Sequence, residues 1–410
     1  MLRHIVKPLL RRPLMPLLVI LQVALACAIA CNALFLLQQK LAPILAPTGI
    51  ENPGHLVFLS NLIARGKPWP AARLRQVQAD LRSVPGVAAA SYAVSLPMVG
   101  TSLMQANVYG ADKRFKADTM VYFGDNLMKV LKLRLVAGRA FTPEENAVTL
   151  GGDMGFHTAG PVIVTRALAD RLYPGGHALG KTLHYSDTAD GQRTIVGIIA
   201  HLPRNRFGRN MRDLDYTILF PGMANQWPLS MFAVRLRGTD VPQVCKKLRE
   251  VLQRDLGARM LPGNEVECKG YSEMRNGMLA QPRAAVWLFS GVTLIVLIVT
   301  LTGIAGMTGY WVQQRTRSIG IRRALGAKRR DVLRELLLEN LLVVGAGVIV
   351  GLIAAYGINL WLMRHYELLR LPWVYLPIGA ALLLVLGQLA VLTPARRASN
   401  IPPIVAARAV

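Results

Sequence analysis

The sequence is short of acidic residues and of cysteine, and both shortages exclude classes of function. Among 410 residues it holds 23 Asp and Glu against 48 Lys and Arg, and it has only four Cys. Four Cys are too few for a disulfide framework, and with the seven His they show no metal-ligand spacing. No Ser has the strand-elbow-helix setting that a nucleophile requires. We therefore expect no catalytic site, metal or cofactor in the chain itself.

Charge is also nearly absent from four long apolar runs. They cover 14–37, 284–312, 336–363 and 371–393, and the only carboxylate inside them is Glu339. A helix of about 20 residues crosses the apolar core of a bilayer, so each run is long enough to span it. Four buried helices of a soluble core would instead show amphipathic stripes, which these runs lack. The sequence predicts four membrane-spanning helices.

The first run has an alternative interpretation as a cleaved signal peptide, because basic residues precede it. Its apolar stretch of 24 residues is longer than a signal core of about 7 to 15. Gln38, Gln39 and Lys40 follow it, where a cleavage site would have small residues. An uncleaved anchor is the better interpretation.

Basic residues beside the runs predict the orientation, because Lys and Arg stay on the cytoplasmic side. Four precede the first run, eight lie between the second and third runs, and three follow the fourth. We therefore expect 1–13, 313–335 and 394–410 in the cytoplasm. The short loop 364–370 and the long segment 38–283 are expected on the other side, in the periplasm of an inner-membrane protein.

The net charge of +25 invites a nucleic-acid interpretation, but its distribution argues against one. Segment 38–283 holds 31 Lys and Arg against 19 Asp and Glu, spread along its length. The rest of the excess flanks the membrane, where basic residues attract anionic lipid headgroups. We expect membrane lipids as partners and no nucleic acid.

The long outer segment shows two β-α-β patterns separated by an insertion. The first pattern lies in 38–98, the second in 229–283, and the insertion 99–228 reads as β-rich. The expected fold is an α-helical membrane protein with one plus three spans and a large α/β domain of two lobes. One lobe is a ferredoxin-like layer of helices on a sheet, and the other is the insertion. Strands of the insertion are expected at 103–110, 161–165, 182–186, 194–200 and 216–220.

Two further features of the outer segment each have two interpretations. Residues 175–182 fit the Gly-x4-Gly-Lys-Thr phosphate loop, but a helix-like stretch precedes them and a strand-like one follows, the reverse of the order that chemistry needs. We interpret them as a turn.

Cys245 and Cys268 lie in the oxidising compartment and suffice for one disulfide. Sequence alone does not place their Cα atoms, so bridged and free forms both stay open.

The connection 313–335 places apolar residues among many basic ones. Ile319, Ile321 and Leu325 alternate with Arg and Lys, and Gly320 and Gly326 punctuate the run. One interpretation is a short amphipathic helix on the membrane surface, with its apolar side toward the spans. The other is a solvated basic loop that only sets the topology. Composition does not choose between them.

A family resemblance favours the helix. Residues 317–327, Arg-Ser-Ile-Gly-Ile-Arg-Arg-Ala-Leu-Gly-Ala, resemble the cytoplasmic signature of MacB/FtsX-type ABC transporter permeases. Segments 394–398 and 403–408 resemble that family's closing pattern. Segments 137–142, 172–181 and 194–199 are similar to parts of its outer domain. Ser318 departs from the family by standing where Glu is usual. We hypothesise that this departure marks one half of a heterodimer.

The resemblance implies a mechanism and partners. A separate cytoplasmic ABC ATPase would use ATP and Mg, and its closure would move the first two spans and, through them, the outer domain, for export or efflux. A second permease copy or paralogue and a periplasmic adaptor are further expected partners. The residues to which the resemblance assigns contact with the ATPase are Arg317, Ile319, Gly320, Ile321, Arg322, Arg323, Ala324, Leu325, Gly326 and Ala327.

Two alternatives remain open at this stage. Glu339 either relays motion by pairing with Arg330 or Arg334, or it simply lies at headgroup depth. The whole chain could also be a sensor or scaffold that binds a ligand outside and signals through a cytoplasmic partner without transport. The cargo of a transporter is not encoded in any of these patterns.

Overall fold

A computed structural model describes residues 14–98, 104–152, 155–156, 158–185, 191–205, 213–224, 226–238, 240–366 and 371–399. The chain forms two compact units. The helical unit is the described part of Met1–Leu41 with that of Arg283–Val410, and the α/β unit is the described part of Ala42–Pro282. The N-terminal segment 1–13, most of the loop 364–370 and the closing pattern at 403–408 lie outside the described residues.

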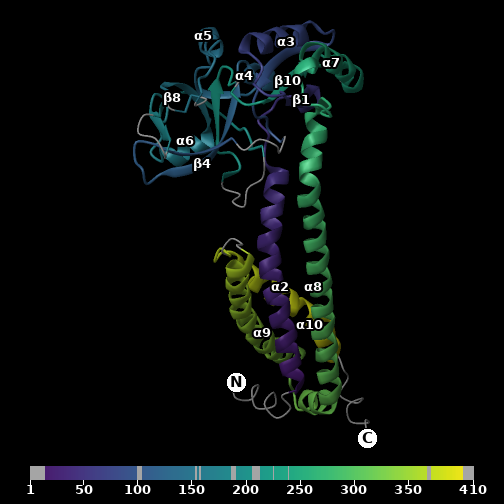
Figure 1. Cartoon of the computed structure of the whole chain (residues 1–410). Coiled ribbons are helices and arrows are strands. Elements are labelled where there is room, and N and C mark those ends of the chain that lie inside the picture. Colours follow the sequence, from purple (N-terminus) through teal and green to yellow (C-terminus); the bar gives the residue numbers. More distant parts are fainter. Residues whose placement is uncertain are drawn as a thin grey trace. The chain divides into compact units, whose positions relative to one another are not determined.

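Four long helices match the four apolar runs (Figure 1). All four are long and apolar enough to cross a membrane, as predicted. All four extend beyond their runs because helix-forming polar residues continue them. The fourth also starts four residues inside its run, after a turn at Pro372. The helices are α2 (Leu14–Leu45), α8 (Tyr271–Ala324), α9 (Arg329–Tyr366) and α10 (Tyr375–Ser399).

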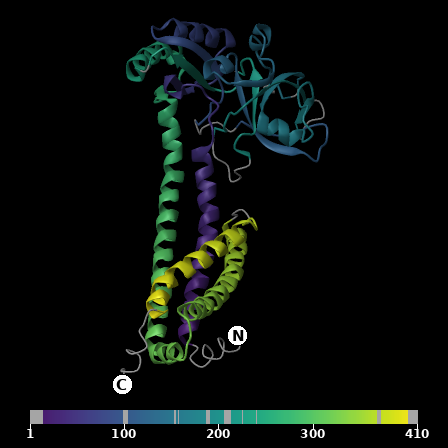
Figure 2. The ribbon, with the colours of Figure 1, turned by 180° about the vertical axis from the view of Figure 1, so that it is seen from behind.

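Small residues allow the helices of the helical unit to pack closely. Cys27 and Cys31 of α2 are fully buried, and α9 and α10 present glycines to them. A Cβ on Gly351 would lie 2.5 Å from the Cβ of Cys27, and one on Gly379 would meet the sulfur of Cys31. Close backbone approach at small residues is how helices associate in membranes. Figure 2 shows α10 passing in front of α2 within this unit.

The first lobe of the α/β unit is ferredoxin-like, as predicted. Its sheet has the order β11-β1-β10-β2 with every neighbour antiparallel. Helix α3 turns Leu74, Val77 and Leu81 into the core, and Asp240 caps α7 by accepting a bond from the Gln243 N–H. The elements are β1 (Leu56–Ile63), α3 (Ala71–Ser83), β2 (Val87–Ala93), β10 (Leu229–Leu236), α7 (Val241–Leu256) and β11 (Glu267–Gly270).

The second lobe is a β-barrel with small helices. Its strands follow the order β5-β8-β6-β9-β4-β3-β7, and β7 also pairs with β8, which closes the ring. Aromatic rings fill the interior, where Phe123, Phe156 and Phe220 contact one another. The elements are β3 (Gln105–Tyr109), β4 (Lys116–Gly124), α4 (Leu127–Leu131), β5 (Leu135–Gly138), α5 (Pro143–Asn146), β6 (Gly160–Thr165), α6 (Arg166–Leu172), β7 (Thr182–Tyr185), β8 (Gln192–Ile199) and β9 (Thr217–Pro221).

The sequence analysis missed the strands β4 and β5 and the short helices α4 and α5 of this lobe. β4 opens with charged residues and β5 has four residues, so neither shows the apolar alternation that identifies a strand. Helix α4 has only five residues, yet it contacts β2 and β10 of the first lobe. Strand β10 of the first lobe is buried along almost its whole length, so both faces of the sheet are covered there.

Candidate functional site

The end of α8 is set by one glycine. The helix runs through Ala324, and Gly326 follows with φ of 100°, a left-handed conformation that favours glycine. The Ala327 N–H donates to the carbonyl of Arg322 at 3.1 Å, the six-to-one bond of a Schellman cap. Residues 313–324 are therefore the end of α8.

Helix α9 begins at Arg329, five residues after the end of α8, with a cap of its own. The Asp331 carboxylate accepts a hydrogen bond from the Lys328 N–H at 3.1 Å, and its negative charge favours the first turn of a helix. The turn 325–328 is thus bounded by a glycine cap on one side and an acidic cap on the other. Such a connection presents a defined tip between two helices.

Two ion pairs join the last turns of α8 to the first turns of α9. Nη1 of Arg322 lies 3.0 and 2.9 Å from the two carboxylate oxygens of Glu335. Nη1 of Arg315 lies 2.8 and 2.9 Å from those of Glu339, whose side chain is only 3% exposed. The next residue, Asn340, donates to the Gly387 carbonyl of α10 at 3.2 Å. Polar contacts of the neighbouring residues Glu339 and Asn340 therefore connect α9 to α8 and to α10.

A hollow of about 460 Å³ lies between the two ion pairs. Ile319 forms its apolar side and is buried together with Val332 and Leu336, whereas Ser318 is exposed at its edge. The residues lining the hollow are Arg315, Ser318, Ile319, Arg322, Val332, Glu335, Leu336 and Glu339.

Two apolar side chains at the tip face outward. Ile321 is 53% exposed and Leu325 is 82% exposed, and they stand among basic residues. The Leu325 N–H donates to the Ile321 carbonyl, so the two residues are neighbours one helical turn apart. Adjacent exposed apolar residues rimmed by charge are a feature of protein-interaction surfaces. We call Ile321, Leu325 and the turn 325–328 the helical tip.

The structure corrects two predictions about this region. A separate surface helix in 313–335 is wrong, because Gly320 is helical and only Gly326 interrupts the chain. Glu339 pairs with Arg315 rather than Arg330 or Arg334. The latter two lie nine and five residues before Glu339 on its own helix, and helical neighbours are three or four apart. The side chains of Arg317 and Arg323 lie outside the described set.

Sequence reasoning missed Arg315 and Glu335 as members of the site. A signal existed, because Arg315 and Arg322 are seven residues apart and Glu335 and Glu339 are four apart. Both spacings put the two charges on one helix face. It could be used only once both segments were known to be helical and adjacent.

The start of α8 lies in the α/β unit, directly after the strand β11. β11 ends at Gly270 and α8 starts at the next residue, Tyr271, which is fully buried against Phe58. A disulfide joins Cys245 of α7 to Cys268 of β11, with Cα atoms 5.7 Å apart. The start of α8 is therefore tied to the ferredoxin-like lobe by packing and by a covalent bond.

The phosphate-loop lookalike is a turn between a helix and a strand, as the order of elements predicted. It follows α6 and precedes β7, and His177 and its glycine neighbours Gly176 and Gly180 take positive φ. The element that directly follows the loop is the strand β7, whereas a phosphate cradle needs a helix N-terminus at that place. Among the described residues, no group of three or more His, Cys, Asp or Glu could hold a metal ion.

Two family models match the chain and together cover both units. The MacB-like periplasmic core domain matches residues 46–251, and the FtsX-like permease C-terminal model matches residues 290–403. The first lies within the α/β unit and the second within the helical unit, including the helical tip.

Similar proteins carry permease names. An uncharacterized ABC transporter permease of Bacillus subtilis, YvrN, is 27% identical over 75% of this chain and 71% of its own length. The macrolide export ATP-binding/permease protein MacB of Chromobacterium violaceum is 24% identical over 70% of this chain, and that of Neisseria meningitidis serogroup A is 25% identical over 68%. The chain spans 42% of the length of each of these two MacB proteins.

Solved structures resemble parts of the chain only distantly. The periplasmic region of MacB from Actinobacillus actinomycetemcomitans covers 56% of this chain and 94% of its own at 12% identity, with a TM-score of 0.35. The extracellular domain of YknZ, from Gram-positive bacteria, covers 52% and 99% at 14% identity, also with a TM-score of 0.35. The assignment therefore rests on the family models and the four spans. This chain belongs to the MacB/FtsX-like family of ABC transporter permeases.

Proposed function

We propose that this chain couples ATP hydrolysis by a separate cytoplasmic ATPase to movement of its periplasmic α/β unit, in export or efflux. The ATPase supplies the ATP and Mg chemistry, and the chain works with a second permease copy or paralogue and with a periplasmic adaptor. Both termini and the helical tip lie in the cytoplasm in this proposal, which the excess of Lys and Arg around the tip supports.

The observation that carries the proposal is the exposure of Ile321 and Leu325. Two ion pairs and two helix caps hold the helical tip in place, so its apolar side chains are presented without a large ordering cost. A partner that buries them gains apolar contact, and the surrounding Arg and Lys favour an acidic rim on that partner. The permease family implies an ATPase as this partner.

The route to the α/β unit is the continuity of two helices. α2 extends to Leu45 and α8 starts at Tyr271, so each helix contributes residues to both units. Each continues as one helix past an internal proline, Pro43 in α2 and Pro282 in α8, which lacks the N–H of one intrahelical bond. A helix transmits displacement along its axis better than a loop, because every backbone group is internally bonded. Motion at the tip of α8 would reach the buried Tyr271 through one element.

Co-purification tests the partner. The full-length chain, tagged and expressed in its own host, should retain vanadate-sensitive ATPase activity after purification. The double variant Ile321→Asp with Leu325→Asp should lose that activity, because a carboxylate cannot be buried in an apolar contact without a large penalty. Ile321→Val with Leu325→Met should keep it.

Leu261→Asp is the matched control for the introduced charge. Leu261 is an exposed apolar residue of the α/β unit, 42% accessible, and lies far along the chain from the tip. It should leave the co-purified ATPase unchanged. Equal activity in the tip variant and wild type would refute the coupling role and favour a sensor or scaffold.

A further inference from the structure

Two hollows adjoin each other in the α/β unit: the first is lined by the barrel lobe alone, and the second lies between the two lobes. One has a volume of about 290 Å³ and the other of about 450 Å³, and Asn126, Phe141 and Asn146 line both. They are walled by α3 of the ferredoxin-like lobe and by α4 and α5 of the barrel lobe. We call the two hollows together the interlobe cleft. Their combined size lies within the range of sites that hold a peptide or a drug-sized molecule.

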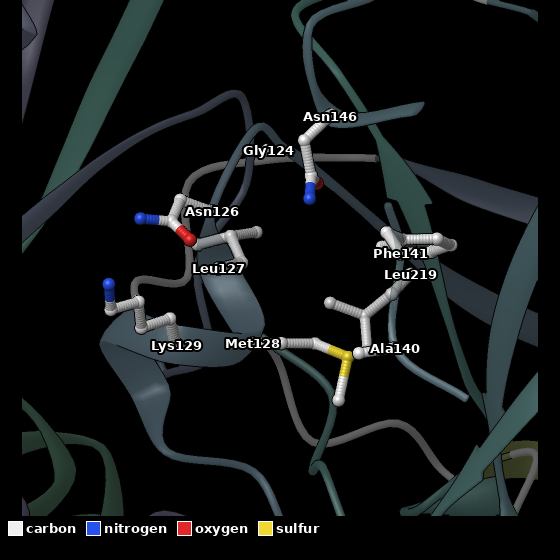
Figure 3. A pocket seen from close by; sticks show the side chains of 9 residues that line it. All are labelled: Gly124, Asn126, Leu127, Met128, Lys129, Ala140, Phe141, Asn146 and Leu219. Atoms are coloured by element: carbon white, nitrogen blue, oxygen red, sulfur yellow. The ribbon is translucent and has the colours of Figure 1, made fainter. Parts of the chain in front are cut away.

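The first hollow has an apolar floor and a polar rim. Figure 3 shows Phe141 and Leu219 on one side of the space, Met128 reaching toward them, and Asn126 and Lys129 on the other side. Lys129 is exposed and makes no hydrogen bond to a described residue. An apolar side chain fits the floor, and an anionic group fits the rim.

The second hollow carries two oriented cations. Arg75 donates to the Ala147 carbonyl at 2.6 Å and to the Thr149 hydroxyl at 2.8 Å, and Arg82 donates to the Ala90 carbonyl at 2.9 Å. Among the described residues these bonds engage one guanidinium nitrogen of Arg75 and two of Arg82, counting the Nε of Arg82. The remaining N–H groups are available to a carboxylate.

Asp125, the acidic residue that lines this hollow, is hydrogen-bonded to other residues of the α/β unit. Asp125 accepts hydrogen bonds from the Gln78 amide at 2.6 Å, the Ser91 hydroxyl at 2.9 Å and the Tyr92 N–H at 3.2 Å. Its carboxylate therefore holds α3, β2 and the end of β4 together. The side chains left to meet a ligand in the cleft are cationic or neutral.

Two amide side chains face the cleft without a partner. Asn126 stands at the N-cap of α4 but makes no side-chain cap bond, and the Asn146 side chain at the end of α5 bonds no described residue. Figure 3 shows the Asn146 side chain directed into the space of the first hollow. A side-chain amide both donates and accepts, which matches the alternating groups of a peptide backbone.

We propose that the interlobe cleft binds an acidic peptide segment in an extended conformation. Its backbone meets Asn126 and Asn146, an apolar side chain covers Met128 and Leu219, and a carboxylate lies at Arg75, Arg82 or Lys129. A lone anion would need only one of the two hollows, and an uncharged apolar ligand would leave the three cations unused. This site is independent of the coupling to an ATPase.

Fluorescence anisotropy on the full-length chain in nanodiscs tests the proposal. The probe is a fluorescein-labelled pentapeptide that alternates aspartate with leucine, and the comparison peptide has asparagine in place of aspartate. The acidic peptide should bind and should weaken with added salt, because exposed charges are screened. Equal binding of the two peptides, or no binding of the acidic peptide at millimolar concentration, would overturn the proposal.

Charge-neutral variants locate the site. Lys129→Gln and Arg75→Gln should each weaken binding by about tenfold, the loss of one charge-assisted contact. Lys246→Gln, an exposed lysine of α7 outside the cleft, is the matched control and should change nothing. If Lys246→Gln weakened binding as much as Lys129→Gln, the peptide would be held by the general positive charge of the unit, and the proposal would fail.

Discussion

Arg315 of α8 and Glu339 of α9 form a pair in which one guanidinium nitrogen lies within 2.9 Å of both carboxylate oxygens. Glu339 is nearly inaccessible, whereas Arg315 remains one-third exposed. The second pair, between Arg322 and Glu335, is more accessible on both sides. The two pairs join the same helices but differ in burial, so they should differ in energy.

Removing the cation of the buried pair should be costly. Arg315→Ala leaves the Glu339 carboxylate buried and unpaired, which we expect to destabilise the chain by about 3 to 5 kcal/mol. Arg322→Ala, the exposed counterpart, should cost about 0 to 1 kcal/mol. Thermal unfolding of both variants in the same detergent measures the difference. Equal losses would mean that burial does not set the strength of these pairs.

The relay role of Glu339 is a separate prediction. Glu339→Gln keeps the shape and a weaker hydrogen bond to Arg315 but removes the charge. We expect the variant to retain its ATPase partner and to lose most of the coupling between ATP hydrolysis and export. Glu335→Gln is the control, because its pair is exposed. Unchanged coupling in Glu339→Gln would dispose of the relay.

The disulfide predicts a reductant-dependent change in the α/β unit. The bond between Cys245 and Cys268 closes a loop across 23 residues and joins α7 to the strand that leads into α8. Cys245→Ser should destabilise the unit by about 2 to 5 kcal/mol. It should also abolish the gel shift between reducing and non-reducing conditions. Cys27→Ala, at a free buried thiol of α2, should leave the shift intact.

The close contact at Gly351 predicts a position that tolerates no side chain. Gly351→Val would drive atoms into Cys27 and into the Ala24 backbone, because an added Cβ already lies 2.5 Å from Cys27. Overpacking of this kind costs about 1 to 3 kcal/mol. Gly357→Val is the matched control on the same helix, since nothing lies within 4 Å of its Cβ position. Thermal unfolding should separate the two variants clearly.

Asp125 predicts a pH dependence of the stability of the α/β unit. Burial raises the pKa of its carboxyl above the usual 3.8, even though Gln78, Ser91, the Tyr92 N–H and the nearby Arg82 favour the charged form. The folded chain therefore binds a proton more readily than the unfolded chain. The resulting stability is fully present below pH 3.8 and is lost as the pH rises through the raised pKa.

Asp125→Asn removes that contribution and isolates it from the other carboxylates. Relative to the variant, wild type should lose stability as the pH rises above 3.8, by about 1.4 kcal/mol for each pH unit between the two pKa values. Denaturant unfolding of the full-length chain between pH 4 and 7 gives the difference. A wild-type curve that runs parallel to that of Asp125→Asn would contradict the raised pKa.

Much of the fold was predictable because the responsible patterns are local. Hydropathy located all four spans, and two β-α-β patterns identified the ferredoxin-like lobe. The barrel lobe was predicted less well. β4 and β5 have weak alternation, and their stability comes from partners such as β9 and β8 that are distant along the chain.

Of the two candidate sites, one was predictable from a local pattern in the sequence and the other was not. The helical tip was found through a contiguous motif, since Ile321, Leu325 and their basic neighbours lie within one short stretch. The interlobe cleft was missed, because Arg75 of α3 meets residues of α4 and α5 only after the lobes have folded. No spacing along the chain connects them.

The sequence by itself determined that the chain spans a membrane four times, that a large α/β domain separates the first two spans, and that a basic segment containing apolar residues connects the second and third. Length, hydropathy and charge carry that information. The tertiary structure decided which charges meet. Arg315 faces Glu339 and Cys245 reaches Cys268 because helix phase and strand order bring distant residues together, and local sequence preferences do not specify such pairings.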